Sequence, residues 1–215
     1  MDQRSPLREV IERERPELSP EIRERLCLFY ELVLKGNQKQ NLTRIVEPEL
    51  FYFANIVDAV AVIHSGLVDY AALDLGSGAG IPGLLCSILS EQPWILCESE
   101  GRKADFLHEA VEALDLKSVQ ISNMRAEDFL LTNQAKSVVC RAVGPVERIY
   151  KWIRKCSTWN NLVLLKGPSW HEEWKAFELT KKGKELRIKK ESAYKSGDSD
   201  RIIVRIERVP RGTAQ

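Results

Sequence analysis

The sequence has few of the features that mark metal-binding, disulfide-rich or membrane proteins. Its cysteines form no C-x-x-C pair and its three histidines are scattered; the cysteines are Cys27, Cys86, Cys97, Cys140 and Cys156. This spacing offers neither a metal-ligand cluster nor a disulfide framework, and it fits a reducing compartment. The apolar runs are far shorter than the ~18 residues of a membrane span, and no basic-then-apolar signal is found at the N-terminus. We therefore expect a soluble cytoplasmic protein without a metal.

The chain also lacks an excess of charge of either sign. Its 32 basic and 31 acidic side chains leave a formal net charge of +1. No global field therefore draws the protein onto nucleic acid, and any nucleic-acid site must be a local patch. The 215 residues, 44% of them hydrophobic, suffice for one core with a modest addition. Internal repeats and low-complexity segments are absent from the sequence.

What the sequence does contain is a short apolar run that enters a glycine-rich turn. Residues 71–83 read AALDLGSGAGIPG, with Asp74 ahead of three alternating glycines and Pro82 where a helix would begin. Glycines accept backbone angles that a Cβ forbids, and they let a ligand approach the main chain. A helix start points unpaired N–H groups at such a ligand. The segment therefore predicts a strand, a nucleotide-type binding turn and a helix.

The glycine spacing helps to separate two ligand classes. Dinucleotide folds favour G-x-G-x-x-G, whereas the run from Asp74 to Gly80 is D-x-G-x-G-x-G and resembles the first motif of class I S-adenosylmethionine-dependent methyltransferases. The next apolar run ends in Glu98, about 20 residues beyond the turn, the usual distance for an acid that binds ribose hydroxyls. This acid suits either NAD or S-adenosylmethionine, and the alternative is that Glu98 only caps or pairs at the next helix.

Helical periodicity precedes the turn. Apolar residues repeat at helical spacing over about 20–34 and 48–64, and the polar segment 36–45 between them is most simply interpreted as a connector. We therefore expect an N-terminal helical appendage over residues 1–66. The rest, residues 67–215, is predicted to form a Rossmann-like methyltransferase domain.

Strands and helices alternate after the turn. The predicted strands are 71–75, 94–98, 118–122, 137–141 and 161–166, and the predicted helices are 82–91, 102–115, a short one at 127–131, 145–156 and 170–182. This α/β alternation predicts a parallel sheet with helices on both faces. Residues 185–192 and 201–209 alternate apolar and charged side chains around a polar loop at 195–200, which predicts an antiparallel hairpin. Such a sheet matches a methyltransferase better than a dinucleotide fold.

Ligands of an open parallel sheet bind beyond the carboxyl ends of its strands. The residues at those ends are Gly76 to Ile81, Glu98, Arg125 to Asp128, Arg141, and Lys166 with Gly167. Adenine needs an apolar wall and hydrogen-bonding groups, which Ile81 and the segment Ala126–Glu127 can supply. Glu127 and Asp128 equally suit the start of a short helix.

Two cations end apolar strands. Arg141 follows the fourth predicted strand and Lys166 follows the fifth, so each side chain must extend toward the cleft. There they would attract phosphate or an electron-rich base. The alternative for each is a structural ion pair with Asp or Glu.

An ordered set of motifs spans roughly residues 20–208: Asn41-Leu-Thr, the turn from Asp74 to Gly83, Glu98-Ser-Glu-Gly-Arg-Lys, Arg125-Ala-Glu-Asp-Phe, Cys140-Arg-Ala and Leu165-Lys-Gly. In order and spacing this set resembles the bacterial 16S ribosomal RNA guanine-N7 methyltransferases, the glucose-inhibited division protein B group. No single motif carries the resemblance alone.

The resemblance implies an enzyme that uses S-adenosylmethionine to methylate a guanine N7 in the 530 loop of 16S ribosomal RNA, with the small ribosomal subunit as partner. A monomer is expected. The implied cofactor contacts are Asp74, Gly76, Ser77, Gly78, Ile81, Glu98, Ala126, Glu127 and Arg141. The implied RNA contacts are Asn41, Arg44, Arg125 and Lys166, with Arg141 and Lys166 as positioning residues.

One segment departs from the family. Members usually carry Arg-His-x-x-Asp-Ser in the helix before the glycine turn, whereas this chain has Ala54-Asn55 and Asp58-Ala59. The change affects the substrate-facing wall more than the cofactor pocket. A methyltransferase for a small molecule or protein, and a non-catalytic cofactor-binding or ribosome-binding module, are therefore the alternatives. Guanine N7 is an exposed lone pair that needs no general base, so activity does not require a catalytic His or Cys.

Overall fold

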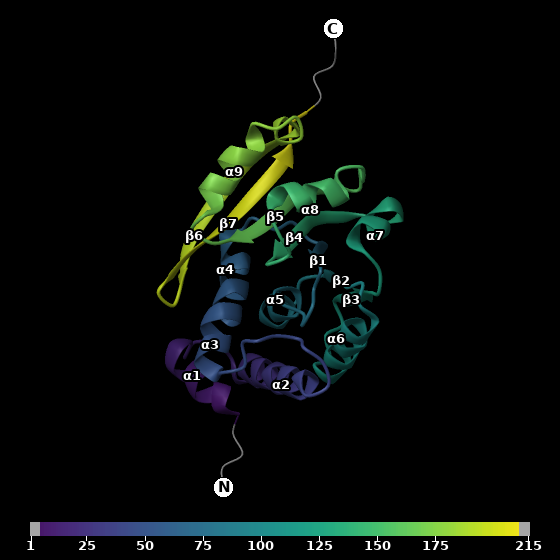
Figure 1. Cartoon of the computed structure of the whole chain (residues 1–215). Coiled ribbons are helices and arrows are strands. Elements are labelled where there is room, and N and C mark those ends of the chain that lie inside the picture. The colour runs from purple at the N-terminus through teal and green to yellow at the C-terminus, as the bar shows by residue number, and fades with distance from the viewer. Residues whose placement is uncertain (1–4, 211–215) are drawn as a thin grey trace.

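The strand that leads into the glycine turn is an inner strand of a seven-stranded sheet in the computed structural model, which describes residues 5–210 (Figure 1). The strands are β1 (Ala72–Leu75), β2 (Trp94–Cys97), β3 (Val119–Ser122), β4 (Ala135–Arg141), β5 (Trp159–Lys166), β6 (Leu186–Ser196) and β7 (Ser199–Arg208). Their order is β3-β2-β1-β4-β5-β7-β6. Strands β1 to β5 are parallel, and β7 is antiparallel to both β5 and β6. The predicted parallel sheet with a terminal antiparallel pair is confirmed.

Helices cover both faces of this sheet. They are α1 (Pro6–Glu14), α2 (Pro20–Asn37), α3 (Pro48–Phe51), α4 (Val57–Ser65), α5 (Gly83–Ser90), α6 (Gly101–Ala113), α7 (Ala126–Thr132), α8 (Val146–Ile153) and α9 (Trp170–Glu178), with a 3₁₀ turn at Gly183–Glu185. Apolar side chains of α1, α2 and α4 to α6 form one core cluster with one face of the sheet, and those of α7 to α9 form a second cluster with the other face. The sheet is therefore the middle of three layers.

The helices before residue 66 contribute directly to the first core cluster. Buried side chains such as Phe29 of α2 and Ile56, in the turn before α4, lie in the same cluster as Val139 of β4 and Val163 of β5. Helix α4 lies against α5 and against the hairpin strands β6 and β7 (Figure 1). The division of the chain at residue 66 stays a prediction, and the core itself continues across it.

Two segments differ from the sequence-based prediction. The helix expected over 48–64 is interrupted by a π-helical turn at Tyr52–Ile56, and such turns are frequent at functional sites. The polar loop expected at 195–200 belongs to strands β6 and β7, which pair up to Ser196 and Ser199 and leave a two-residue turn in which Gly197 has φ 58°. Ser196 Oγ donates to the Phe53 carbonyl at 2.6 Å. The hairpin tip is thereby held against the π-helical turn.

The order of the strands reverses between β1 and β4, because β2 and β3 lie to one side of β1 and β4 to the other. Open α/β sheets bind ligands at such a switch point, beyond the carboxyl ends of the strands. Among residues 5–210, no helix is long and apolar enough to cross a membrane.

Candidate methyl-donor and substrate site

The glycine turn after β1 has the backbone geometry of a ligand cradle. Gly76 and Gly78 have φ angles of 71° and 55°, which residues other than glycine rarely adopt. The N–H groups of Gly76 and Ser77 donate to the Cys97 carbonyl at 2.9 and 3.2 Å, which fixes the turn against the end of β2. Gly78 leaves open space where a Cβ would be, apart from the Gly76 carbonyl at 3.9 Å. The first part of the turn therefore presents bare backbone.

The later glycines serve packing. A Cβ on Gly80 would lie 2.5 Å from Leu84 Cδ1, and one on Gly83 would overlap Leu96 Cδ2 and lie 2.8 Å from Asp74 Oδ2. The helix α5 begins at Gly83, one residue after the predicted Pro82. The close approach of α5 to β1 and β2 therefore requires glycine at position 83, and the packing of the turn against Leu84 and Leu107 requires it at position 80.

Asp74 supports the turn from beneath. Its side chain is 1% exposed, and its Oδ2 accepts a hydrogen bond from the Gly83 N–H at 3.0 Å. Burial raises the pKa of this carboxyl from 3.8 to about 7, against the opposing effect of the Gly83 hydrogen bond. Asp74 thus joins the strand to the start of α5. Its buried position makes it a support of the turn rather than an exposed ligand group.

Glu98 spans the glycine turn and the start of α6. Its Oε2 accepts from the Gly78 N–H and its Oε1 from the Glu100 N–H, both at 2.9 Å. Glu100 is the N-cap of α6, so the capping alternative is correct for one oxygen. The other oxygen lies at the middle of the glycine turn. Each carboxylate oxygen can accept a further hydrogen bond, so ribose binding remains compatible with both contacts.

A cavity of about 140 Å³ adjoins this turn at the ends of β1, β2 and β3. Its lining includes Gly76, Ser99, Ala126, Glu127 and Val143. A Cβ on Gly76 would come within 3.4 Å of Val143 Cγ2, so a side chain there would narrow the cavity. Backbone N–H groups, a nearby carboxylate and apolar side chains suit an adenosine group. The residues present therefore fit S-adenosylmethionine.

The residues that follow β3, from Arg125 to Glu127, differ in their exposure. Arg125 is exposed at the N-cap of α7, and Ala126 is buried at the first position of that helix. Arg125, Ala126 and Glu127 all line the 140 Å³ cavity. Glu127 also lies in the first turn of α7, so the helix-start interpretation and the cavity-lining interpretation both hold.

Arg141 forms a structural ion pair with an acidic residue, which the sequence analysis gave as the alternative to a contact in the cleft. Its Nε lies 3.0 Å from Asp58 Oδ2, and its Nη1 donates to Asn55 Oδ1 at 2.8 Å. Tyr194 of β6 donates its hydroxyl to the other oxygen of Asp58 at 2.7 Å. Burial raises the pKa of Asp58, while Arg141 and the Tyr194 hydrogen bond act in the opposite direction. A cofactor contact by Arg141 therefore stays a prediction.

This network includes the segment that departs from the family pattern. Asn55 and Asp58 are each 1% exposed, and both contact Arg141. Asn55 belongs to the π-helical turn and Asp58 to α4. The wall is thus held together by an arginine, a carboxylate and an amide. In the range from residue 5 to residue 210, Asn55 Nδ2 is buried without a hydrogen-bond partner.

Lys166 is also paired. Its Nζ lies 2.8 and 3.1 Å from the two carboxylate oxygens of Glu173 on α9, and it donates to the Gly144 carbonyl at 3.1 Å. The same nitrogen lies 5.6 Å from the ring centroid of Trp170. The structural ion pair is therefore present, and a direct contact of Lys166 with RNA stays a prediction.

A second cavity, of about 410 Å³, lies at the carboxyl ends of β4 and β5. Its lining includes Asp58, Arg141, Lys166, Tyr194 and Arg201, and it shares Val143 with the 140 Å³ cavity. The two cavities therefore adjoin at the switch point. We call them the donor cavity (140 Å³) and the substrate cavity (410 Å³).

Three predicted contacts lie outside these cavities. Asn41 and Arg44 are exposed in the segment between α2 and α3, and Ile81 is half-buried against the first core cluster. The segment is ordered by Asn37, whose Oδ1 accepts from the Leu42 and Thr43 N–H groups at 2.9 and 3.1 Å. The roles of Asn41, Arg44 and Ile81 stay predictions.

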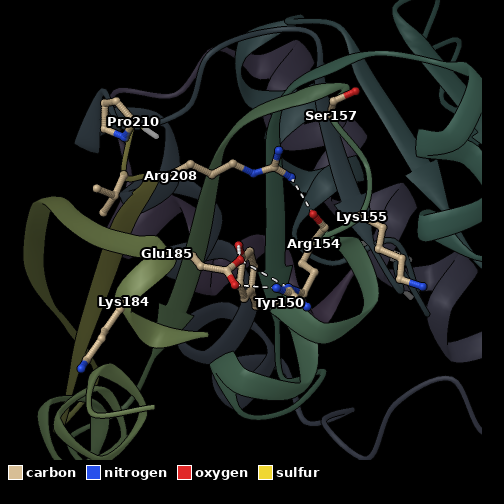
Figure 2. Close-up of a pocket in the computed structure, with 9 residues that line it drawn as sticks. Tyr150, Arg154, Lys155, Ser157, Lys184, Glu185, Arg208 and Pro210 are labelled. Atoms are coloured by element: carbon tan, nitrogen blue, oxygen red, sulfur yellow. Dashed lines mark hydrogen bonds and ion pairs between the residues drawn. The ribbon is translucent and has the colours of Figure 1, made fainter. Parts of the chain in front are cut away.

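A third cavity, of about 870 Å³, lies at the other edge of the sheet, where β5 begins and β7 ends (Figure 2). Three of its side chains bind one another: Glu185 accepts from the Tyr150 hydroxyl at 2.7 Å and pairs with Arg154. Figure 2 shows Arg154 and Glu185 turned toward each other in its middle. Because parallel-sheet ligands bind at the opposite edge, this cavity is separate from the donor site. Among the described residues, no group of three or more histidine, cysteine, aspartate or glutamate side chains could hold a metal ion.

The fold defines the class of protein. The structure is similar to MtNAS solved in complex with S-adenosylmethionine, with a TM-score of 0.58 at 15% identity over 94% of this chain and 83% of that chain. It is also similar to M. capricolum TrmK in complex with S-adenosylhomocysteine, with a TM-score of 0.54 at 13% identity over 69% of this chain and 67% of that chain. The chain has the class I S-adenosylmethionine-dependent methyltransferase fold.

The family follows from the sequence matches. The family model described as rRNA small subunit methyltransferase G matches residues 22–203. The ribosomal RNA small subunit methyltransferase G of Solibacter usitatus is 35% identical over 82% of this chain and 86% of its own length. That of Psychromonas ingrahamii is 25% identical over 94% and 97%. The chain belongs to the rRNA small subunit methyltransferase G family, and the predicted resemblance is confirmed.

Sequence reasoning missed several residues of the two cavities. Ser99 and Val143 line the donor cavity and lie one and two residues past predicted strand ends, so extending the strand-end rule by two residues would have found them. Tyr194 and Arg201 reach the substrate cavity from the hairpin. No local signal in the sequence shows that the hairpin folds back to this edge.

Proposed function

We propose that the protein transfers the methyl group of S-adenosylmethionine to N7 of a guanine in the 530 loop of 16S ribosomal RNA. The family match over residues 22–203 is the observation that carries the substrate class. The cofactor is supported by the Gly76–Gly78 cradle, the bridging carboxylate of Glu98 and the donor cavity beside them. A ribosomal substrate implies a cytoplasmic location and the small ribosomal subunit as partner.

The residues divide the task between the two cavities. The glycine turn and Glu98 would hold the adenosine portion, with Ala126 and Val143 beside the base. S-adenosylmethionine supplies an electrophilic methyl carbon bonded to a sulfonium sulfur. The substrate cavity shares Val143 with the donor cavity, so a base held in it would lie on the β4 and β5 side of the bound donor.

The reaction needs alignment more than proton transfer. The lone pair of guanine N7 forms the new bond to carbon, and the electrons of the broken C–S bond stay on sulfur. No proton has to leave N7, so the site needs no general base. Holding the reacting atoms in line can contribute about 7–11 kcal/mol. The network of Asp58, Arg141 and Tyr194 joins α4, β4 and β6 in the wall of the substrate cavity.

The proposal is tested by supplying labelled S-adenosylmethionine and four separate acceptors. These are small ribosomal subunits and naked 16S RNA, both without the modification, together with large subunits and bulk protein. Label on the small-subunit RNA alone supports the proposal. Label on protein, or on low-molecular-weight material, would favour a different acceptor class. Binding of S-adenosylhomocysteine without label on any acceptor would favour a non-catalytic role.

A further inference from the structure

The substrate cavity is lined by three cations that differ in how they are neutralised. Arg141 pairs with Asp58, and Lys166 pairs with Glu173. Arg201 is the third cation in the lining. In the part of the chain that the structure describes, Arg201 forms no ion pair, and its Nε is buried without a hydrogen-bond partner.

The fold holds Arg201 at this position. Arg201 of β7 is the cross-strand partner of Tyr194 on β6, and the next residue, Ile202, pairs with Lys166 of β5. Tyr194 in turn donates to Asp58. Arg201 is half-buried, so the strand and its neighbours limit where the guanidinium can lie. It therefore faces the cavity from a regular strand rather than from a loose loop.

The carboxylate in the lining of this cavity, Asp58, is already engaged. Asp58 accepts from Arg141 through one oxygen and from Tyr194 through the other, while Arg201 influences it only through its charge. A guanidinium that is partly removed from water and has no acceptor costs free energy. An anion entering the cavity would supply the missing acceptor. Arginine is well suited to this, since its planar fork binds phosphate through two parallel hydrogen bonds.

We propose that Arg201 binds a backbone phosphate of the substrate RNA beside the target guanosine. This inference rests on the proposed function. The other familiar use of arginine, a fork to O6 and N7 of guanine, is excluded here, because N7 must stay bare to accept the methyl group. A phosphate contact leaves the base edge free. Arg201 is thus a substrate-binding residue that fixes the RNA chain while the base enters the cavity.

The test compares Arg201→Gln with Lys190→Gln. Lys190 is an exposed cation of the same hairpin outside the cavity, so its variant removes the same charge as a matched control. For methylation of small subunits or 16S RNA, Arg201→Gln is expected to raise KM about tenfold to hundredfold. The salt dependence of RNA binding should lose about one unit of slope. The affinity for S-adenosylhomocysteine should not change, and Lys190→Gln should behave as wild type.

An unchanged KM and salt slope in a folded Arg201→Gln protein would overturn the inference while leaving the proposed function intact. Failure of the wild-type protein to methylate RNA would instead overturn the proposed function. If Arg201→Gln does not fold, Arg201→Lys decides the question, because it keeps the charge and loses the fork. A phosphate contact then predicts a raised KM with a near-normal salt slope, and wild-type values of both would overturn it.

Discussion

Arg141 at the end of β4 and Asp58 on α4 form a largely buried ion pair, with 3.0 Å between Arg141 Nε and Asp58 Oδ2. Asp58 is 1% exposed and receives a second hydrogen bond from Tyr194 of the terminal hairpin. One carboxylate thus joins three parts of the chain that are distant in sequence. The pair lies in the wall of the substrate cavity, so its loss would affect both stability and activity.

Removing one partner of this ion pair should lower the free energy of unfolding. Arg141→Met leaves the Asp58 carboxylate buried without its cation, and we expect a loss of about 3–5 kcal/mol in the free energy of unfolding. The double variant Asp58→Asn with Arg141→Met should recover part of that loss, because neither charge is then left alone. Urea unfolding of the wild type, both single variants and the double variant measures the coupling. Strictly additive losses would contradict the buried pair.

The packing of α5 against the sheet should depend on Gly83. In Gly83→Ala the new Cβ would meet Leu96 and Asp74, and we expect a loss of about 1–3 kcal/mol. Gly167→Ala is the matched control, since nothing lies within 4 Å of a Cβ at that position. Midpoints of urea unfolding give the comparison. Equal stability of the two variants would show that α5 does not approach β1 as closely as the structure indicates.

Asp74 should make stability depend on pH. Burial raises its folded-state pKa from 3.8 to about 7, so the folded protein holds the proton more tightly than the unfolded chain. Its favourable contribution is full below pH 3.8 and is lost as the pH rises through about 7. Asp74→Asn keeps an acceptor for the Gly83 N–H and cannot ionise. The variant should therefore gain stability relative to wild type between about pH 4 and 8, by about 1.4 kcal/mol per unit of pKa shift.

The control for this prediction is Asp105→Asn, which removes an exposed carboxylate on α6. Urea unfolding of the three proteins across the pH range gives the curves. The curve of Asp105→Asn should run parallel to that of wild type, whereas the curve of Asp74→Asn should diverge from it. Parallel curves for all three would refute a buried, protonated Asp74.

Glu98 should set the affinity for the methyl donor. Glu98→Gln removes the negative charge that would receive ribose hydroxyls, and a hydrogen bond to a charged group contributes about 1.5–3 kcal/mol. We expect calorimetry to show S-adenosylhomocysteine binding weakened by about tenfold to hundredfold. Glu100→Gln is the control, because its exposed side chain pairs with Lys103 at the surface. Undiminished affinity in Glu98→Gln would remove Glu98 from the cofactor site.

The sheet and the donor side of the site were predictable because their signals are local. The run from Asp74 to Gly83 determines a strand, a turn and a helix start from adjacent residues, and Glu98 follows from the usual spacing between two strands. The parallel order follows from the alternation of strands and helices. The hairpin loop was predicted less accurately, because pairing in the folded sheet extends the strands through polar residues such as Lys195 and Ser196.

The substrate side could not be predicted in the same way. Asp58, Arg141 and Tyr194 meet through tertiary packing across more than half of the chain, and no spacing rule relates them. The pairing of Lys166 with Glu173 could be anticipated only as an alternative, since the sequence does not show which way a strand-end cation turns. Arg201 was missed because the sequence shows neither its place in the cavity nor that it lacks an ion-pair partner among residues 5–210.

The central claim is methylation of one guanine at N7 in the 530 loop, and base mapping tests it most directly. Small ribosomal subunits that lack the modification are incubated with the wild-type protein and S-adenosylmethionine, and the 16S RNA is digested and analysed by mass spectrometry and by cleavage at N7-methylguanine. The account predicts a single new N7-methylguanine, located in the 530 loop. A methyl group on another atom or on another RNA would contradict this account. So would the absence of methylation on both naked 16S RNA and small subunits by a protein that still binds S-adenosylmethionine.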